Sequence, residues 1–272
     1  MSRLPVSGDR KSLLLGTALA STLLIGGILM PAPAGAVVNS CTDPGPDAVF
    51  INSAAPISCI NTETRNEPGV GFAIELRASG AASYIYVHSS GELTASSNMQ
   101  NTFGIFASTQ DANSRIDVVN LGDISVTATG NHHYAFGLVA RTSGNGSPIT
   151  SIVNSGHMSV TSENKYGSAY GIYARTEGAD SGIYSIANSG TLVVTGGGTD
   201  GARAIGIFAR TDSSDSPLSI VNSGDITVTA TVETGTYAAS AFGIFAGTYG
   251  QQQSHRHRKL RRFHRHRNRD RQ

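Results

Sequence analysis

One short phrase recurs along the chain at a fixed interval, and few folds accommodate such a repeat. The copies are VVNLGDISVTATG (118–130), IVNSGHMSVTSEN (152–164), IANSGTLVVTGGG (186–198) and IVNSGDITVTATV (220–232). Their asparagines are evenly spaced, at Asn120, Asn154, Asn188 and Asn222. A fixed period of this length is typical of a solenoid, in which each unit packs against the next one.

A second phrase interleaves with the first. Its copies are FGIFAST from Phe103, FGLVART from Phe136, YGIYART from Tyr170, IGIFART from Ile205 and FGIFAGT from Phe242. Residues 71–80 (GFAIELRASG) and 87–97 (VHSSGELTASS) resemble an eroded earlier copy. The chain therefore contains roughly five copies, and their differences in spacing fall in the loops.

Apolar residues within each copy alternate with a period of two, which indicates strands. In the second phrase Phe136, Leu138 and Ala140 share one parity and are predicted to face inward. In the first phrase Ile152 and Asn154, then Met158 and Val160, have the inward parity on either side of a corner at residues 155–156. Each copy thus predicts three short strands, one tight corner and two looser turns rich in Gly, Ser and Asp.

Three short strands with one apolar face each cannot enclose a core alone, but stacked copies can, with parallel strands about 4.8 Å apart. The prediction is an all-β, right-handed parallel β-helix, a β-solenoid of three-strand coils of about 34 residues. One triangular coil per repeat is preferred, and two shorter coils per repeat are the alternative. Asn120, Asn154, Asn188 and Asn222 are then expected to stack as an amide ladder that satisfies these buried polar groups.

Residues 1–36 have the pattern of an export signal. Arg3, Arg10 and Lys11 precede the apolar stretch LLLGTALASTLLIGGILM, and Ala34-Gly35-Ala36 provides the small-x-small sequence that signal peptidase cleaves. An uncleaved membrane anchor is the alternative, because the apolar stretch approaches the length of a membrane span. The sequence predicts cleavage after Ala36 and export of the chain.

The two cysteines, Cys41 and Cys59, fit an oxidising compartment. We expect them to form a disulfide that stabilises the fold by about 3 kcal/mol. A disulfide at the start of the mature chain is suited to an N-terminal cap. We therefore assign residues 37–70 to a cap and residues 71–250 to the repeats. Metal binding by two thiols without a nearby His is not expected.

Charge is distributed very unevenly. Residues 37–250 contain eight basic and seventeen acidic residues, whereas residues 251–272 contain nine Lys and Arg, four His and one acid. An acidic body repels nucleic acid and anionic membrane surfaces, so nucleic acid is not an expected partner.

The alternating GIYART-type and IVNSGDITVTAT-type phrases, behind a long signal peptide and a two-Cys start, resemble the passenger region of bacterial autotransporters. The resemblance covers residues 37–250. It implies a β-helical protein of the cell surface or the secreted fraction, with a membrane β-barrel translocator after the passenger. Residues 251–272 stand where this resemblance implies the translocator, so contact with a membrane is expected only through that missing barrel.

The basic run QQQSHRHRKLRRFHRHRNRDRQ (251–272) is explained by a change of reading frame. Written with permitted codons and read after dropping the first base, it becomes NNSPIAIVNSGDFTVTATGTA, which is the repeat phrase. Third bases are free, but the second base of a His, Arg, Lys or Leu codon is fixed by the residue. A His-Arg pair therefore allows only Ile or Thr, and Lys-Leu allows Asn or Ser. The sequence predicts a frameshift near Gly250 and a tail without an evolved function.

Two other readings of residues 251–272 remain alternatives. The basic residues are suited to phosphate or anionic lipid, and HRHR is suited to a divalent metal. The composition predicts disorder, because too few residues are apolar. A tail of this kind would leave the last strand edges bare and open to self-association.

Enzyme signatures are weak, and no catalytic, cofactor or metal residue is assigned. Residues 178–182 (GADSG) depart from the serine-protease loop, and residues 196–201 (GGGTDG) fall short of a calcium-binding repeat. Both are predicted to be turns. Asp123 and Asp225 follow corner glycines, but His157 and Thr191 at the equivalent positions break any carboxylate row. The exposed column Phe106, Tyr173, Phe208 and Phe245 is expected to be surface stacking rather than a sugar-binding strip.

The sequence therefore predicts an exported, non-enzymatic β-solenoid that acts as an adhesin or surface stalk. Loops 109–115, 142–149, 176–182 and 211–217 would present variable residues to a host surface, another cell or a glycan. The intact form is expected at the cell surface or secreted, and this chain in the periplasm. Two alternatives are a secreted β-helical enzyme acting on polysaccharide and a self-associating matrix protein.

Overall fold

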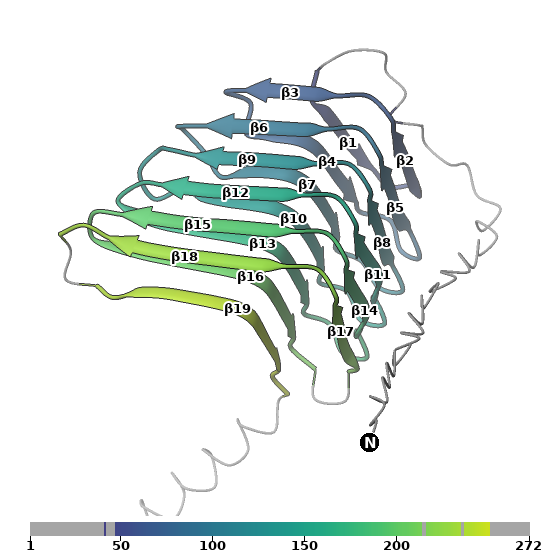
Figure 1. The fold of residues 1–272 in the computed structure, drawn as a ribbon. Helices are drawn as coiled ribbons and strands as arrows, with labels where there is room; N and C mark the ends of the chain where they lie inside the picture. Colours follow the sequence, from purple (N-terminus) through teal and green to yellow (C-terminus); the bar gives the residue numbers. More distant parts are fainter. Residues whose placement is uncertain (1–40, 42–46, 214–215, 235–236, 251–272) are drawn as a thin grey trace, which may run out of the picture. The chain divides into compact units, whose positions relative to one another are not determined.

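The computed structural model describes residue 41 and residues 47–213, 216–234 and 237–250. The predicted signal peptide (1–36) and basic tail (251–272) lie outside these described residues. The chain divides into residues 1–34 and 35–272, and all described residues belong to the second unit. They form 19 strands in three parallel sheets, drawn as stacked arrows in Figure 1.

The three sheets are named here by the strands that compose them, in the order in which the strands pair. Sheet 1 contains β1 (Val49–Ser53), β4 (Phe72–Ala78), β7 (Thr102–Thr109), β10 (Tyr134–Thr142), β13 (Tyr166–Thr176), β16 (Gly201–Thr211) and β19 (Ala239–Thr248). Sheet 2 contains β2 (Ile57–Asn61), β5 (Tyr84–Ser89), β8 (Arg115–Asn120), β11 (Ile149–Asn154), β14 (Ile183–Asn188) and β17 (Leu218–Asn222). Sheet 3 contains β3 (Arg65–Pro68), β6 (Leu93–Ser97), β9 (Ile124–Ala128), β12 (Met158–Glu163), β15 (Leu192–Gly198) and β18 (Ile226–Val232).

Each coil contributes one strand to each sheet and then rises to the next coil. Equivalent residues of successive copies pair directly, for example Asn154 with Asn188 in sheet 2 and Val160 with Val194 in sheet 3. Every strand pair is parallel, as Figure 1 shows. The predicted β-solenoid is confirmed, with one three-strand coil per repeat rather than two shorter coils.

The core lies between the three sheets. In one coil it receives Leu138 from sheet 1, Ile152 from sheet 2 and Val160 from sheet 3, each fully buried. Burying a side chain of this size contributes about 1.5–3 kcal/mol relative to exposure. Because the same three positions recur in the next coil, the core continues along the stack of coils.

The prediction that Phe136 faces the core is wrong. Leu138 and Ala140 belong to the core, but Phe136 packs outside sheet 1 with Tyr170 and Phe208. A Cβ on the intervening Gly137 would point inward and meet the Met158 side chain at 2.2 Å. The alternation of faces therefore breaks at this glycine, which lets the Met158 side chain occupy the space at the bend.

The first coil begins inside the segment expected to be a separate cap. Strands β1, β2 and β3 lie between residues 49 and 68 and pair with β4, β5 and β6 of the following coil. The described part of the solenoid thus includes β1, β2 and β3, in residues that were expected to form the cap.

Candidate binding surface

The turns that connect sheet 1 to sheet 2 form one row on the surface of the solenoid. Four of these turns contain a residue with a positive φ, between 56° and 64°, and these residues are called the tip row: Ala82, Asn113, Gly146 and Asp180. Three of them are exposed, and Gly146 is half-buried. The backbone conformation repeats from turn to turn while the side chain changes. Three of the four predicted variable loops contain a tip-row residue, and the fourth, 211–217, is described only in part.

Backbone hydrogen bonds hold the turns of the tip row against each other. The amide of Asn113 donates to the carbonyl of Asn145 over 2.9 Å, and the amide of Gly146 donates to the carbonyl of Ala179 over 2.8 Å. Each bond joins one coil to the next, so these turns continue the ladder of the adjoining sheets instead of moving independently.

A buried serine follows each tip-row residue and fixes the turn from inside. The Ser147 hydroxyl accepts from the Ser114 amide at 3.0 Å, and the Ser181 hydroxyl accepts from the Ser147 amide at 2.9 Å. Ser181 also donates to the carbonyl of Gly144 at 2.9 Å and is fully buried. Residues 178–182 therefore form a structural turn, as predicted. This serine row was not predicted, although Ser147 and Ser181 are separated by the same interval as the ladder asparagines, which was a usable signal.

A cluster of alternating charges lies at the ends of β10, β13 and β16, beside these turns. Glu177 accepts from Arg141 at 2.7 Å and from Arg175 at 3.2 Å. Asp212 accepts from Arg175 at 2.9 Å and from Arg210 at 2.6 Å. Burial raises the pKa of Asp212, but the hydrogen bonds from Arg175 and Arg210 outweigh it and leave this pKa below its ordinary value. The cluster links three successive coils through paired charges.

Two columns of aromatic rings run along the outer face of sheet 1. Phe136 stacks on Phe103 and Tyr170 at centroid distances of 5.2 and 5.0 Å, with the rings within 12° of parallel. In the second column Phe208 stacks between Tyr173 at 4.8 Å and Phe245 at 5.5 Å.

The faces of these rings are covered by neighbouring rings. A sugar that stacks on an aromatic side chain needs a free ring face, whereas the stacked rings present mainly their edges. Tyr170 and Phe208 are both only 8% exposed. Tyr173, Phe208 and Phe245 of the expected column therefore stack on one another, which adds about 0.5–1.5 kcal/mol per pair, but Phe208 is buried rather than exposed and Phe106 contacts Phe103 edge-on. This geometry favours stacking over a sugar-binding strip.

The predicted asparagines form a continuous amide ladder at the corner between sheets 2 and 3. Nδ2 of each asparagine donates to Oδ1 of the next one, from Asn120 to Asn154 at 2.8 Å, from Asn154 to Asn188 at 2.8 Å and from Asn188 to Asn222 at 2.7 Å. The same nitrogen donates to a carbonyl two residues further on, such as that of Gly156 for Asn154. Asn120, Asn154 and Asn188 are buried, so the ladder satisfies polar groups that would otherwise be costly to bury.

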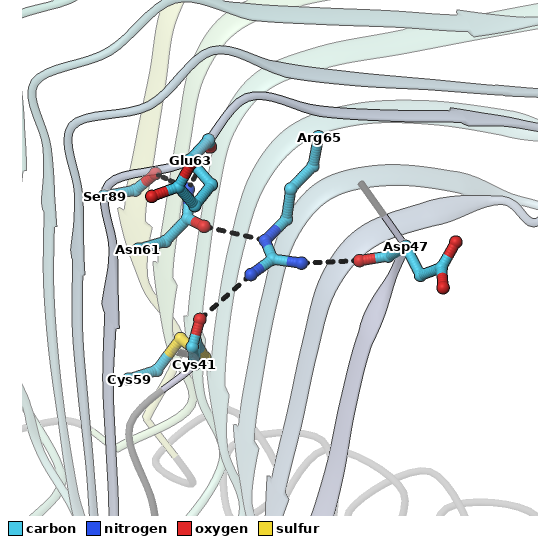
Figure 2. Close-up of a disulfide and its surroundings, with 7 residues drawn as sticks. All are labelled: Cys41, Asp47, Cys59, Asn61, Glu63, Arg65 and Ser89. Carbon is cyan, nitrogen blue, oxygen red and sulfur yellow. Dashed lines mark hydrogen bonds between the residues drawn. A yellow bond between two sulfur atoms is a disulfide. The ribbon is translucent and has the colours of Figure 1, made fainter. Parts of the chain in front are cut away.

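A buried arginine and the predicted disulfide close the first end of the solenoid. Figure 2 shows Arg65 reaching three oxygens: Oδ1 of Asn61 at 2.7 Å, the carbonyl of Asp47 at 2.6 Å and the carbonyl of Cys41 at 2.9 Å. Cys41 is joined to Cys59, and both are buried. The arginine is 1% exposed. Its role was not predicted from the sequence, because a single Arg outside the repeat carries no periodic signal.

Asp123, one of the two corner carboxylates discussed above as a possible carboxylate row, bonds to the backbone of the next coil. Oδ1 of Asp123 accepts a hydrogen bond from the backbone amide of His157 at 2.9 Å, so this carboxylate fixes the next corner. Among the described residues, no three or more His, Cys, Asp or Glu side chains are placed to hold a metal ion. In the same part of the chain, no helix has the length and apolar character needed to cross a membrane.

Comparisons with family models, with curated proteins and with solved structures give no match for this chain. Its function is therefore inferred from the geometry of the solenoid and from the sequence.

Proposed function

We propose that this chain is an exported, non-catalytic passenger of the autotransporter type that acts as an adhesin or surface stalk. Three features support the proposal. The described residues form a β-solenoid of stacked repeats, Cys41 and Cys59 form a disulfide suited to an oxidising compartment, and residues 1–36 have the pattern of a signal peptide. The intact form reaches the cell surface or the medium, and the present form stays in the periplasm.

The observation that carries the adhesin function is the tip row. Its backbone conformation repeats in four successive turns, with φ near 60°, while its residues are Ala82, Asn113, Gly146 and Asp180. By contrast, the core and ladder positions keep the same residue type from coil to coil, as at Asn154 and Asn188. The solenoid thus holds a constant framework and varies the side chains at one exposed edge. Such an arrangement is suited to presenting a recognition surface.

The mechanism of binding is geometric. The turns lie one strand spacing apart, about 4.8 Å, and backbone hydrogen bonds such as that from Gly146 to Ala179 restrict their motion. A surface that is already ordered loses little conformational entropy when a partner binds. Asn113, Asn145 and Asp180 are exposed and supply hydrogen-bonding groups for a protein or glycan on another cell.

The adhesin function is tested with the full chain, exported and purified, on coated beads. Bead retention is measured on cultured cells and on immobilised surface glycans and proteins. The double variant Asn113→Ala, Asp180→Ala changes the tip row and should lower retention about tenfold, as expected when a binding hot spot is removed. The matched control, Ser125→Ala with Thr129→Ala, changes two exposed residues associated with sheet 3 and should leave retention unchanged. Equal losses in both variants, or no retention of the parent chain, would contradict the proposal.

The polysaccharide-active alternative is tested with the same preparation. The protein is incubated with polysaccharides of cell walls and capsules, and reducing ends and unsaturated products are measured. Unchanged polymer size is expected. Progressive shortening of a polymer would replace the adhesin proposal with the enzymatic one.

A further inference from the structure

The last coil of the described solenoid leaves an apolar cross-section uncovered. Strands β17, β18 and β19 are the terminal strands of their sheets, and each pairs on one side only, with β14, β15 and β16. Ile207 in β16 is fully buried, whereas its partner Ile244 in β19 is 46% exposed. The terminal edge is defined as the inward-facing residues of these three strands: Leu218, Ile220, Ile226, Val228 and Ile244.

The amide ladder also ends at this edge. Nδ2 of Asn154 donates both to the carbonyl of Gly156 and to the next asparagine, and Nδ2 of Asn188 makes the same two kinds of bond. Nδ2 of Asn222 donates to the carbonyl of Gly224, its one acceptor among the described residues. Asn222 is exposed. Its second N–H is placed to meet the Oδ1 of an asparagine one coil further on.

The two ends of the ladder are therefore chemically different. On the other side Ser89 interrupts the ladder before Asn120, and in the first coil Oδ1 of Asn61 accepts from Arg65, which is 1% exposed. Two copies that met by their terminal edges would bring two exposed ends of the ladder together, and Oδ1 of each Asn222 already accepts from Asn188 of its own chain. A further coil of the same repeat instead offers an Oδ1 acceptor and parallel strands.

We infer that the terminal edge is the docking surface for one more coil of this repeat, and that the reading frame adjacent to residues 251–272 encodes that coil. The shifted reading, NNSPIAIVNSGDFTVTATGTA, supplies an asparagine as its ninth residue. That asparagine follows Phe245 by 14 positions, the same distance that separates Asn222 from Phe208. The Ser-Pro pair of the shifted reading also coincides with Ser216-Pro217 of the preceding coil.

With the third bases chosen to write the repeat phrase, the shifted residues fall in register with the terminal edge. Counting from the aligned asparagine, Ile falls opposite Leu218, Ile opposite Ile220, Phe opposite Ile226 and Val opposite Val228. Glycine falls opposite Gly224. This matters because a Cβ on Gly224 would lie 2.0 Å from the carbonyl oxygen of Gly190, and Gly156 is equally close to Gly122. The residues of the tail thus permit a shifted sequence that meets the apolar, amide and steric requirements of the earlier coils.

The first test is the nucleotide sequence of codons 251–272. We expect the frame that starts one base later to read as the repeat phrase. Codons for the basic run that do not encode this phrase would overturn the inference. This result is independent of the adhesin function, which depends on the tip row and is measured by bead retention.

The second test compares the full-length chain with a frame-restored chain, residues 1–250 followed by the shifted sequence. Hydrogen–deuterium exchange of the amides in β17, β18 and β19 should slow by about tenfold or more in the frame-restored chain, because exchange there requires opening of another coil. Amides of β10 and β11 serve as the internal reference for folding. Unchanged exchange at the terminal strands, with the reference protected, would overturn the inference.

Two further measurements distinguish the proposed extra coil from a second copy of the chain as the occupant of the terminal edge. Light scattering should show that the full-length chain does not dimerise through its terminal strands. A dimer in which the amides of β17, β18 and β19 are already protected would assign the terminal edge to a second copy of the chain and overturn the inference. If the frame-restored chain fails to fold, a synthetic peptide of the shifted sequence is added to the full-length chain, with a scrambled peptide as control. Slower exchange of β17–β19 with the ordered peptide alone supports the inference, and equal exchange with both peptides overturns it.

Discussion

Nε of Arg65 donates a hydrogen bond of 2.7 Å to Oδ1 of Asn61, the residue that pairs with Ser89 in the register of sheet 2. Nδ2 of Asn61 then donates to the Ser89 hydroxyl at 3.2 Å, so the chain of side-chain hydrogen bonds begins at a guanidinium. Because a guanidinium carries only donors, Arg65 satisfies Oδ1 of Asn61 without an asparagine beside it.

The middle of the amide ladder should contribute much more to stability than its end. Asn154→Ala removes the acceptor of Asn120 and the donor of Asn188 inside the core. Leaving buried polar groups unpaired costs about 1–3 kcal/mol each, so we expect a loss of about 2–4 kcal/mol in the free energy of unfolding. Asn222→Ala, at the exposed end, should cost less than about 1 kcal/mol. Urea denaturation of the two variants checks the difference, and equal losses would contradict the role of the ladder.

Ser89 interrupts the ladder, and replacing it should stabilise the fold. Ser89 pairs with Asn120 in the register of sheet 2, yet the buried Oδ1 of Asn120 has no hydrogen-bond partner among the described residues. In Ser89→Asn the new Nδ2 can donate to that oxygen, which should add about 1 kcal/mol. Thermal unfolding measures the gain. Ser97→Asn, at a buried serine outside the ladder, is the control and should lower the midpoint. Destabilisation by Ser89→Asn would show that the site lacks room for the amide.

The period of the repeat was sufficient to predict the solenoid and the amide ladder. In parallel, in-register stacking, residues that are one repeat apart in the sequence lie next to each other in the fold. Asn154 and Asn188, one repeat apart, therefore had to meet. Strict alternation failed at Phe136, since Gly137 lets the strand change its face within one residue. Arg65 could not be predicted, because its partners are backbone carbonyls at Cys41 and Asp47 that only the folded chain brings together.

The charged cluster predicts a loss of stability in acid. Although burial raises the pKa of Asp212, hydrogen bonds from Arg175 and Arg210 lower it below the ordinary value of 3.8. A carboxyl group whose pKa is lower in the folded state stabilises the fold above its unfolded pKa, and this contribution disappears as the pH falls through the folded pKa.

The variant Asp212→Asn should therefore be less stable than the parent chain at about pH 5–7, by less than about 1 kcal/mol because the pair is partly solvated. The difference should vanish below the folded pKa. Unfolding midpoints measured between neutral and acidic pH check this. Ser125→Ala, at an exposed position without a titratable side chain, should show no such dependence. A difference that persists in strong acid would indicate a steric effect of the substitution.

Adding a single methyl group at a corner glycine should lower the free energy of unfolding strongly. A Cβ on Gly156 would lie 1.9 Å from the carbonyl oxygen of Gly122 in the preceding coil, which no rotation of a side chain can relieve. The backbone cannot easily shift away, because Asn154 beside the corner is held by its neighbours in the ladder. Gly156→Ala should therefore destabilise the fold by about 3 kcal/mol or more, at the upper end of single substitutions.

Gly197, in β15 of the next coil, provides the comparison. A Cβ added to Gly197 would have Oγ1 of Thr231 as its nearest neighbour at 3.7 Å, an ordinary contact. Gly197→Ala should therefore be neutral or stabilising by about 0.4–1 kcal/mol, because alanine restricts the unfolded chain. Guanidinium unfolding of both variants measures the contrast. Similar free energies for the two would mean that the coils can separate at the corner, and the close stacking of Gly122 and Gly156 would then not limit the spacing of the coils.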